Sequence, residues 1–396
     1  MSRTARTARI YRATQRNIEF LAARLRAGEL VAVPTETVYG LAADAFDCAA
    51  CASVFRAKGR PSEDPLIVHV HAMTQLSEVC HVNDTALRLA KAFWPGPLTL
   101  VLPKKPIIPD IVTAGRDSVA IRMPSHPVFR RLLRAVDVPL AAPSANPFGY
   151  VSPTSAQHVL DGLGAKLRYI LDGGPSQIGL ESTIVDLRDP ARPVVLRPGF
   201  ITVTQIARVL RCRLLPKAQR FRGAEARSQS REGAEVLRCG DQAQNVSDSI
   251  RAAKRASFLA APPRLRSSVP LIRAGARITL GKGAKATASK GGALAPGQLA
   301  RHYSPRTPVR LRARLKLPRR PNPQHAYLLM RKPSGPLHPN VFWLDPHGDL
   351  QGVARQLFAM LRKLDAMGFD VIHAELARGS GLADAINDRL RRAAAR

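Results

Sequence analysis

The sequence holds few cysteines, few aromatic residues and no long hydrophobic run. Five cysteines among 396 residues, an odd number, argue against a disulfide framework and favour a reducing compartment such as the cytoplasm. Cys48 and Cys51 form a CxxC pair without a second pair at zinc-ligand spacing, so a structural role on a helix is the preferred interpretation. No stretch reaches the ~18 uninterrupted apolar residues that a transmembrane helix requires, so no membrane association is expected. Residues 1–15 are basic without an apolar core, so they do not form a secretory signal; their Arg and Thr content resembles a transit peptide, but a short basic tail is preferred.

Acidic side chains are also scarce. The chain has 29 acidic and 61 basic residues, a net charge of +32, and this excess points to nucleic acid or another polyanion as a partner. Residues 12–210 hold 22 basic and 17 acidic side chains (net +5), residues 216–300 hold 16 and 5 (net +11), and residues 301–396 hold 18 and 7 (net +11). A genome rich in G and C would also enrich arginine everywhere, so an RNA-contacting role for these basic parts stays open.

Strand and helix signals alternate over residues 12–210, which predicts an α/β domain. Ile18, Leu21 and Leu25 repeat at helical spacing, and Gly28 suits the end of that helix. Ser152 and Pro153 are expected to cap and begin another helix. Further helices are expected near 49–57, at 84–93 with Asn83 or Asp84 as its cap, and at 127–133 with Pro127 in its first turn. Strands are expected at 30–33, 66–70, 98–102, 118–122, 139–142, 168–171, 182–187 and 193–196. The last three strands lack intervening helices, which indicates a mixed sheet.

The rest of the chain divides into two parts. Residues 216–300 are rich in alanine, arginine, glycine and serine, with Phe221 and Phe258 as their only aromatic residues, so long parts are expected to be loosely ordered. Residues 326–394 return to a strand–helix–strand–helix alternation, which predicts a small α/β unit.

Several segments of the first half carry groups suited to binding anions. Lys58 and Arg60 lie in KGR between a helix and a strand, where two cations can neutralise phosphate charge; a solvated loop is the alternative. PSANPFGYVSPT at 143–154 offers hydroxyls and backbone amides, and Ser152 an expected helix N-terminus; an ordinary turn is the alternative. LDGGPSQIGLESTIVD at 171–186 has glycines that permit close approach of a ligand, with a hairpin turn as the alternative.

Two arginines and one loop lie at expected strand ends. PTETVYG at 34–40 follows the first buried strand, and ligands of open α/β sheets bind beyond strand ends. Arg122 ends SVAIR and Arg197 ends PVVLR, and each guanidinium can form paired hydrogen bonds to a carboxylate or phosphate. A cavity lined by Ser, Thr, Lys and Arg without a catalytic pair favours chemistry between a nucleotide and an acid over hydrolysis.

Five motifs together resemble the YrdC-like threonylcarbamoyl-AMP synthases and occur in that family's order. They are KGRPSEDPLIVH, FWPGPLTLVL, SVAIRMPSHP, AAPSANPFGYVSPT and DGGPSQIGLESTIVD, and the likeness spans residues 12–210 almost continuously. PGQLARHYSPRTPV at 296–309 and the run 357–390 resemble the linker and C-terminal domain of the long two-domain form. The resemblance implies a YrdC-like twisted mixed sheet with a basic cavity at 12–210, a basic, partly disordered linker at 211–308, and a small Rossmann-like α/β domain at 309–396.

The resemblance also implies a reaction, in which L-threonine, bicarbonate and ATP give threonylcarbamoyl-adenylate and pyrophosphate, with Mg²⁺ bridging phosphate oxygens. A second, transferase machinery would move the group to the adenosine beside a tRNA anticodon, so tRNA or that machinery is the expected partner. The residues that match ATP-binding positions are Lys58, Ser62, Ser118, Ser144, Ser152, Arg197 and Tyr303, with Lys58 and Arg60 as catalytic cations. Those that match threonine-binding positions are Thr35, His69, Arg122, Ala142 through its backbone, and Ser182, with Tyr39 and Asn146 as weaker candidates. Arg122 is expected to bind the threonine carboxylate, whereas Asp64, an acid in the basic loop, departs from the family's pattern.

Two other functions compete with this one. A non-catalytic RNA-binding protein would suit the net charge, but the chain lacks the aromatic residues interleaved with basic ones that stacking surfaces use. A carbamoyl transferase that uses carbamoyl phosphate, as in hydrogenase maturation proteins, would carry a cysteine-rich zinc finger, whose spacing does not occur in this sequence.

Overall fold

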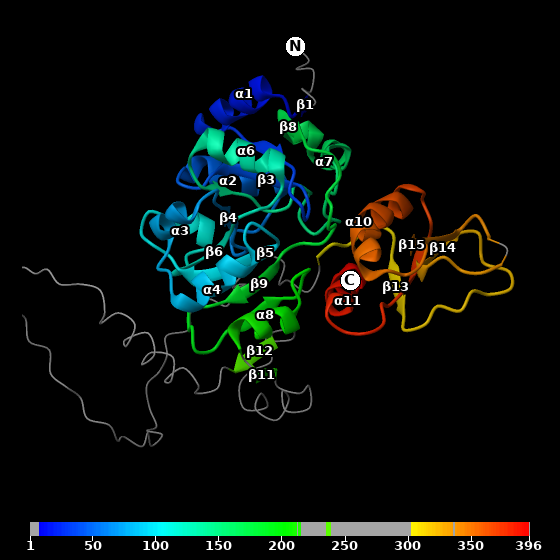
Figure 1. Ribbon diagram of the computed structural model, residues 1–396. Coiled ribbons are helices and arrows are strands. Elements are labelled where there is room, and N and C mark those ends of the chain that lie inside the picture. The colour runs from blue at the N-terminus through cyan, green and yellow to red at the C-terminus, as the bar shows by residue number, and fades with distance from the viewer. Residues whose placement is uncertain (1–7, 212, 215–234, 239–301, 336, 396) are drawn as a thin grey trace, which may run out of the picture. The chain divides into compact units, whose positions relative to one another are not determined.

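The computed structural model describes residues 8–211, 213–214, 235–238, 302–335 and 337–395. This part of the chain contains a 12-stranded mixed sheet and a four-stranded parallel sheet, each with its own helices (Figure 1). None of the described helices is long and apolar enough to cross a membrane. Most of the expected linker, 211–308, lies outside the described residues.

The elements follow the chain in this order. The helices are α1 (Gln15–Arg26), α2 (Cys48–Lys58), α3 (Met73–Val79), α4 (Asp84–Phe93), α5 (Asp110–Thr113), α6 (Pro127–Val136), α7 (Ala156–Leu163), α8 (Val203–Leu210), α10 (Leu350–Ala366) and α11 (Leu382–Ala394). The strands of the large sheet are β1 (Arg9–Arg12), β2 (Val31–Val33), β3 (Gly40–Asp44), β4 (Ile67–His69), β5 (Leu98–Pro103), β6 (Ser118–Arg122), β7 (Leu140–Ala141), β8 (Tyr169–Asp172), β9 (Thr183–Asp186), β10 (Val194–Arg197), β11 (Arg213–Leu214) and β12 (Glu235–Arg238). Those of the small sheet are β13 (Val309–Arg312), β14 (His325–Arg331), β15 (Val341–Asp345) and β16 (Val371–Glu375).

Capping residues set the helix ends, mostly where the sequence predicts them. Gly28, with φ of +77°, follows the end of α1, a conformation that glycine adopts without a Cβ clash. The side chain of Asn83 accepts the amide of Ala86 at the start of α4, and Pro127 occupies the first turn of α6. These three predictions are confirmed.

The prediction that Ser152 and Pro153 begin α7 is wrong. The helix starts three residues later, because Ser155 caps it by accepting the amide of His158 at 3.2 Å. Ser152 is fully buried instead, and its hydroxyl donates to Oε1 of Glu181 at 2.6 Å. Ser152 therefore does not present a helix N-terminus to a ligand.

The large sheet mixes parallel and antiparallel pairs, as predicted. Its strand order is β1-β8-β2-β3-β7-β4-β6-β5-β9-β10-β12-β11. β8 pairs in parallel with β1 and β2, whereas β9 pairs in parallel with β5 and antiparallel with β10. Six strands separate β8 from β9, so residues 173–182 cross the sheet and the hairpin alternative for this segment is wrong.

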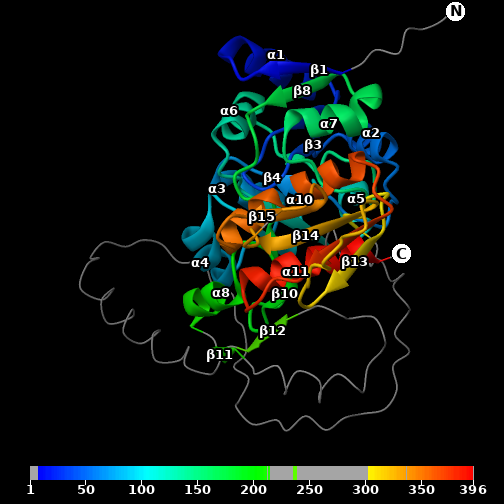
Figure 2. The ribbon, with the colours of Figure 1, turned by 90° about the vertical axis from the view of Figure 1, so that its right-hand side faces the viewer.

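Helices cover both faces of the large sheet (Figures 1 and 2). Val31 and Val33 of β2 lie in a core cluster with Ile18 of α1 and Phe129 of α6, whereas Ala32 lies in the cluster of the opposite face. Burial on both faces explains why several strands are continuous apolar runs rather than alternating ones.

The C-terminal sheet has the order β13-β16-β14-β15, with all neighbours parallel. Ala326 and Leu328 of β14 pack in a core with Phe358 of α10, and Tyr327 and Leu329 lie in a separate cluster. The small α/β unit predicted for 326–394 is confirmed, but β13, β14 and β15 all precede α10, so the order is not a strict strand–helix alternation, and β13 was not predicted.

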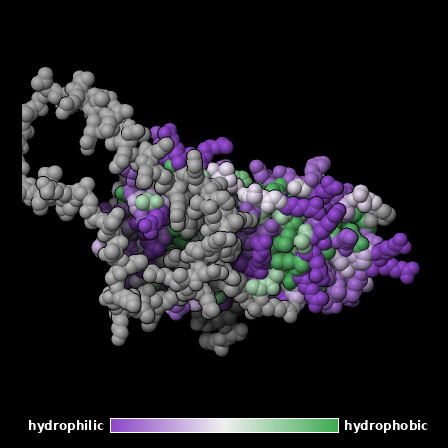
Figure 3. All heavy atoms as spheres, turned by 90° about the horizontal axis from the view of Figure 1, so that it is seen from below, coloured by the Kyte–Doolittle hydropathy of each residue, from purple (hydrophilic) through white to green (hydrophobic). Residues whose placement is uncertain are grey.

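Basic side chains concentrate at the start of the C-terminal sheet. Over the described residues 302–335 and 337–344 there are nine basic side chains and no acidic one, and Arg310, Arg312 and Arg314 are exposed. Seen from below, hydrophilic side chains dominate the described surface, and hydrophobic ones gather mainly in a smaller area (Figure 3).

Candidate functional site

A pocket brings most of the candidate residues together. Its walls come from loops at the ends of β2, β4, β6, β7 and β10 and from the segments around 181 and 303. Nine of the thirteen candidates line it: Thr35, Arg60, His69, Arg122, Ala142, Ser144, Ser182, Arg197 and Tyr303. The structure does not place Lys58, Ser62, Ser118 or Ser152 in the lining. Three arginines, Arg60, Arg122 and Arg197, line the pocket and offer the guanidinium groups that an anion-binding site requires.

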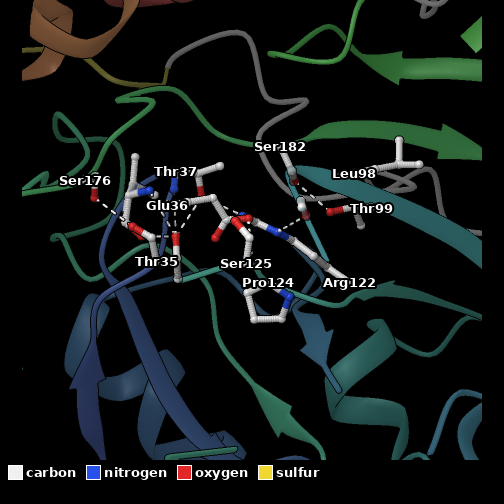
Figure 4. A network of polar contacts seen from close by, with 12 residues as sticks. Thr35, Glu36, Thr37, Leu98, Thr99, Arg122, Pro124, Ser125, Ser176 and Ser182 are labelled. Carbon is white, nitrogen blue, oxygen red and sulfur yellow. Dashed lines mark hydrogen bonds and ion pairs between the residues drawn. The ribbon is translucent and has the colours of Figure 1, made fainter. Parts of the chain in front are cut away.

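The loop after β2 is held by its own threonines (Figure 4). The hydroxyl of Thr35 donates to the carbonyl of Val38 at 2.6 Å and lies 2.8 Å from the hydroxyl of Thr37. Ser176 donates to the carbonyl of Thr35 at 3.0 Å, which ties this loop to the segment between β8 and β9. Short polar side chains that bond nearby backbone fix a turn in this way, so both threonines have set positions in the pocket.

Arg122, at the end of β6, is the hub of this network (Figure 4). Its Nη2 lies 2.6 Å from Oε1 of Glu36, its Nη1 donates to the hydroxyl of Thr37 at 2.9 Å, and its Nε donates to the carbonyl of Gly96 at 3.2 Å. Burial acts to raise the pKa of Glu36, but the Arg122 guanidinium and the Ser125 amide outweigh it and hold the pKa below its usual value. Glu36 is therefore ionised, and the pair fixes the orientation of the guanidinium.

Ser182 links the expected threonine-binding and ATP-binding residues. Its hydroxyl lies 2.7 Å from the hydroxyl of Thr99. Arg197 donates from Nε to the carbonyl of Ser182 and from Nη2 to its hydroxyl, both at 3.1 Å. The two halves of the pocket are thus in direct contact, which would place two bound substrates next to each other.

Lys58, the last residue of α2, is buried behind the pocket rather than in its lining. Its Nζ donates to the carbonyls of Ser144 and Asn146. Burial and the nearby Arg60 guanidinium lower the pKa of Lys58 well below its usual value. In this structure the lysine supports the loop that carries Ser144.

Asp64 is the counterion of Arg60. Oδ2 of Asp64 lies 2.9 Å from Nη2 of Arg60, and the guanidinium also donates to the carbonyls of Asp64 and Pro65 at 2.9 and 2.8 Å. Both side chains are buried, and burial raises the pKa of Asp64 against the effect of Arg60. This acid of the otherwise basic loop thus fixes a cation of the pocket.

His302 and Tyr303 contribute adjacent aromatic rings to the lining. Their ring centroids lie 4.1 Å apart, and Tyr303 stacks on Phe358 of α10 at 5.3 Å. Tyr303 is fully buried with φ of +63°, and burial raises its pKa to about 12. Within the described residues its hydroxyl has no hydrogen-bond partner, so it is available to a ligand.

His69 is neutral in this pocket. Burial, with the Arg122 guanidinium, lowers its pKa to about 3, and its ring packs 5.5 Å from that of Phe129. A neutral imidazole next to Arg122 adds hydrogen-bonding capacity without adding charge.

The remaining candidates lie outside the lining. Ser62 is exposed on its loop, and Ser118 is buried at the start of β6. Tyr39 donates its hydroxyl to the carbonyl of Gly174 at 2.7 Å, and Asn146 donates to the carbonyl of Tyr150 at 2.8 Å. Tyr39 and Asn146 therefore stabilise the loops around the pocket.

Comparisons with known proteins agree with this architecture. A family model described as "Telomere recombination" matches residues 23–199, and one described as "Threonylcarbamoyl-AMP synthase, C-terminal domain" matches residues 267–395. The crystal structure of Pyrococcus abyssi Sua5 complexed with L-threonine is similar with a TM-score of 0.71 and 32% identity, covering 98% of each chain. The chain belongs to the YrdC-like threonylcarbamoyl-AMP synthase family.

Curated members of the family match the first half of the chain. The threonylcarbamoyl-AMP synthase of P. abyssi is 48% identical over 194 residues, which are 49% of this chain and 57% of that protein. The threonylcarbamoyl-AMP synthase of Bacillus subtilis is 50% identical over 191 residues, 48% of this chain and 55% of that protein. The match thus spans just over half the length of these relatives. A second P. abyssi Sua5 structure, with alanine in place of an adjacent histidine and tyrosine, has a TM-score of 0.69, with 32% identity over 98% of this chain and 96% of that one.

The residues that line or support the pocket but are absent from the predicted set include Thr37, Glu36, Glu181 and His302. Thr37 and Glu36 lie in the predicted loop 34–40, and Glu181 lies in the predicted segment 171–186, so the motifs indicated their location but not their role. His302 precedes the predicted Tyr303. The role of an acidic side chain beside the pocket can be assigned only once its arginine partner is known.

Proposed function

We propose that the chain is an L-threonylcarbamoyladenylate synthase, which forms threonylcarbamoyl-AMP and pyrophosphate from L-threonine, bicarbonate and ATP. The observation that carries the proposal is the pocket itself, which Arg60, Arg122 and Arg197 line together and in which Arg197 donates to the hydroxyl of Ser182. Its family membership and the likeness to a structure solved with L-threonine support the choice of substrate. The activity belongs to the nucleotidyl-transfer class.

The threonine half of the site is proposed to lie around Arg122. Two of its N–H groups would bind the substrate carboxylate, while Thr35 and Ser182 would bind the amine or hydroxyl. The backbone of Ala142 and the neutral ring of His69 would complete this half. Since His69 carries no proton on its second nitrogen near neutral pH, it would add no repulsion to a substrate amine.

The ATP half is proposed to lie around Arg60 and Arg197, with Ser144 and Tyr303. Two buried guanidinium groups would stabilise the charge that develops on the α-phosphoryl oxygens and on the leaving pyrophosphate. Lys58 would reach a phosphate by releasing one of its two carbonyl partners, and the phosphate charge would raise its lowered pKa again. Three further ATP-binding candidates come from the resemblance alone and lie outside the pocket lining: Ser62, Ser118 and Ser152.

The chemistry needs positioning and cations rather than a nucleophilic side chain. The threonine amine adds to bicarbonate or CO₂ to give a carbamate, with loss of water or a proton. A carbamate oxygen then attacks the α-phosphorus of ATP and pyrophosphate leaves with the electron pair of the broken P–O bond. Holding both substrates in adjoining halves of one pocket makes this second step effectively unimolecular.

Mg²⁺ is proposed to enter with ATP. Among the described residues no group of three or more His, Cys, Asp or Glu side chains could hold a metal ion. Mg²⁺ prefers phosphate oxygens and water to an all-protein cage, so the phosphates of ATP and water would hold most of the ion. The ion would neutralise phosphate charge together with Arg60 and Arg197.

The wider setting of this reaction is also a proposal. The product would serve the modification of adenosine beside the anticodon of tRNA, and tRNA or its transferase machinery would be the partner. The exposed side chains of Arg310, Arg312 and Arg314 suit contact with a polyanion such as tRNA. We assign catalysis to residues 12–210, with residues 211–308 as a linker and 309–396 as the C-terminal domain.

Product formation tests the proposal. The full chain is incubated with ATP, bicarbonate and L-threonine, and the mixture is examined by mass spectrometry for threonylcarbamoyl-AMP and for pyrophosphate. Both products should appear together and should be lost when threonine or bicarbonate is left out. ATP binding without either product would refute the proposal and favour the RNA-binding alternative.

A further inference from the structure

A fully buried arginine of the last helix reaches the pocket from outside the proposed catalytic machinery. Arg389 lies in the second half of α11, and its side chain has an exposed fraction of 0%. Removing a guanidinium from water is unfavourable unless other groups pair with it. The partners of Arg389 therefore indicate what it does.

The guanidinium contacts three segments that form or flank the pocket. Its Nε donates to Oε2 of Glu181 at 3.0 Å, and its Nη1 donates to the carbonyl of Pro198 at 2.9 Å and to Asp388 at 2.8 Å. Its Cζ lies 5.5 Å from the ring centroid of Tyr303, a cation–π distance. Glu181 and Tyr303 both line the pocket, and Pro198 follows the lining residue Arg197.

Glu181 is the one carboxylate that lines the described pocket. Its Oε1 accepts the hydroxyl of Ser152 at 2.6 Å and its Oε2 accepts Nε of Arg389, so each oxygen of this lining carboxylate has a partner. Without Arg389 this negative charge would face a bound triphosphate and compete with it for Arg60 and Arg197. Repulsion between buried like charges is strong because little water screens them.

We propose that Arg389 is a positioning residue that neutralises Glu181 and so keeps the pocket able to bind ATP. This role rests on the proposed adenylate-forming function, and it makes ATP binding depend on the C-terminal domain. Arg389 acts through Glu181 and the ring of Tyr303, and it does not touch the proposed positions of the substrates.

The test compares the full-length chain with Arg389→Met, Arg389→Lys and the double variant Glu181→Gln/Arg389→Met. Arg389→Met should raise the KM for ATP at least about tenfold and change the KM for threonine by less than about twofold, because the uncompensated carboxylate faces the phosphates. Arg389→Lys keeps the cation, and the double variant removes both charges, so each should restore the KM for ATP to within about threefold of the wild type. A merely structural arginine would not be rescued by removing its partner.

Arg362→Met is the matched control. Arg362 is also a buried arginine of the C-terminal domain, but it donates to the carbonyls of Val151 and Ser152 and pairs with no carboxylate that lines the pocket. It should lower the melting temperature without raising the KM for ATP. Circular dichroism shows which variants fold; if Arg389→Met does not fold, the other two variants decide.

Two results would overturn the proposal: an unchanged KM for ATP in Arg389→Met, or a defect for ATP in both Arg389→Lys and the double variant. If the wild type makes no threonylcarbamoyl-AMP, the proposed function fails separately. The dissociation constant of ATP, measured by calorimetry on the same variants, then tests Arg389 with the same expected ratios.

Discussion

Oε1 of Glu36 lies 2.6 Å from Nη2 of Arg122, so the arginine proposed to bind a substrate carboxylate already holds a carboxylate of the protein. The same oxygen accepts the amide of Ser125 at 3.1 Å. A guanidinium has five N–H groups, and in the described part of the chain Glu36, Thr37 and Gly96 engage three of them. The remaining two lie on a group whose orientation is fixed before substrate arrives, which lowers the entropic cost of binding.

Replacing Arg122 should therefore affect threonine more than ATP. Arg122→Lys keeps the charge but loses the planar guanidinium that forms paired hydrogen bonds. Losing a pair of charge-assisted bonds worth ~3 kcal/mol should lower kcat/KM for threonine about 100-fold. Steady-state kinetics with each substrate varied would measure this. Arg188→Lys, at an exposed arginine that pairs with Asp186 outside the lining, is the control and should behave as wild type. Equal losses for both substrates would contradict the assignment.

Lys58→Met should remove the response of the protein to ATP. The variant leaves the carbonyls of Ser144 and Asn146 without their donor, so the unfolding free energy should fall by ~1–3 kcal/mol. ATP in excess raises the melting temperature of a protein that binds it. Thermal melts with and without ATP should show a clear rise for the wild type and little rise for the variant. A full ATP-induced rise in Lys58→Met would show that the lysine only supports the loop.

Ser152→Ala tests the corrected role of Ser152. Its hydroxyl donates to a buried carboxylate oxygen of Glu181, so its removal should cost ~1–3 kcal/mol of stability. Ser155→Ala, which removes the cap of α7, should cost ~1 kcal/mol and leave ATP binding unchanged. Urea denaturation measures both. A loss for Ser152→Ala no larger than that of an exposed serine would argue against the buried bond.

The buried His69 and the partly buried His158 should make the protein less stable in mild acid. His69 has a pKa of about 3 in the folded state, and His158 about 4, because of burial, whereas an unfolded histidine titrates near ~6.5. The unfolded state thus binds more protons between these values, so stability is lost as the pH falls below ~6.5. Each histidine contributes roughly 2 kcal/mol of loss by pH ~5.

Urea denaturation at pH ~7 and ~5 measures this effect. His69→Asn should lose about 2 kcal/mol less than the wild type between the two pH values, whereas His338→Asn, at an exposed position, should match the wild type. Identical losses in all three proteins would mean that His69 is protonated in the folded state.

The exposed arginines at the start of the C-terminal sheet should affect RNA but not adenylate formation. Replacing Arg310, Arg312 and Arg314 with serine removes three positive charges from a segment without acidic residues. If they contact phosphates, the slope of log K against log salt should fall by about 2 to 3. Filter binding to tRNA over a salt series measures the slope. An unchanged slope, or loss of threonylcarbamoyl-AMP formation, would contradict this partition of roles.

Local signals account for most of what the sequence predicted. The end of α1 at Gly28, the Asn83 cap and the first-turn Pro127 need only nearby residues, and they were predicted correctly. The prediction that Ser152 caps α7 is wrong because Ser155 is a second suitable cap nearby. Ser152 bonds instead to Glu181, which is 29 residues away in sequence. Strand β13 is not predicted, because its two apolar residues alternate with exposed arginines over only four positions.

The electrostatic partners in and around the pocket could not be predicted from pattern alone. Arg389 lies on a helix with basic neighbours, which is typical of a solvated helix end, and its partner Glu181 is 208 residues away. Glu36 and Arg122 are also brought together only by the order of the sheet. The motifs locate the pocket, and long-range pairing determines which charges remain available to a ligand.

The fate of labelled substrates tests the central claim most directly. The chain is supplied with ATP, ¹³C-bicarbonate and ¹⁵N-threonine, and the masses of the adenylate products are measured by mass spectrometry. The account predicts one adenylate that carries both labels, formed in equal amount with pyrophosphate. ADP and phosphate as the products, or an adenylate without the bicarbonate carbon, would contradict it.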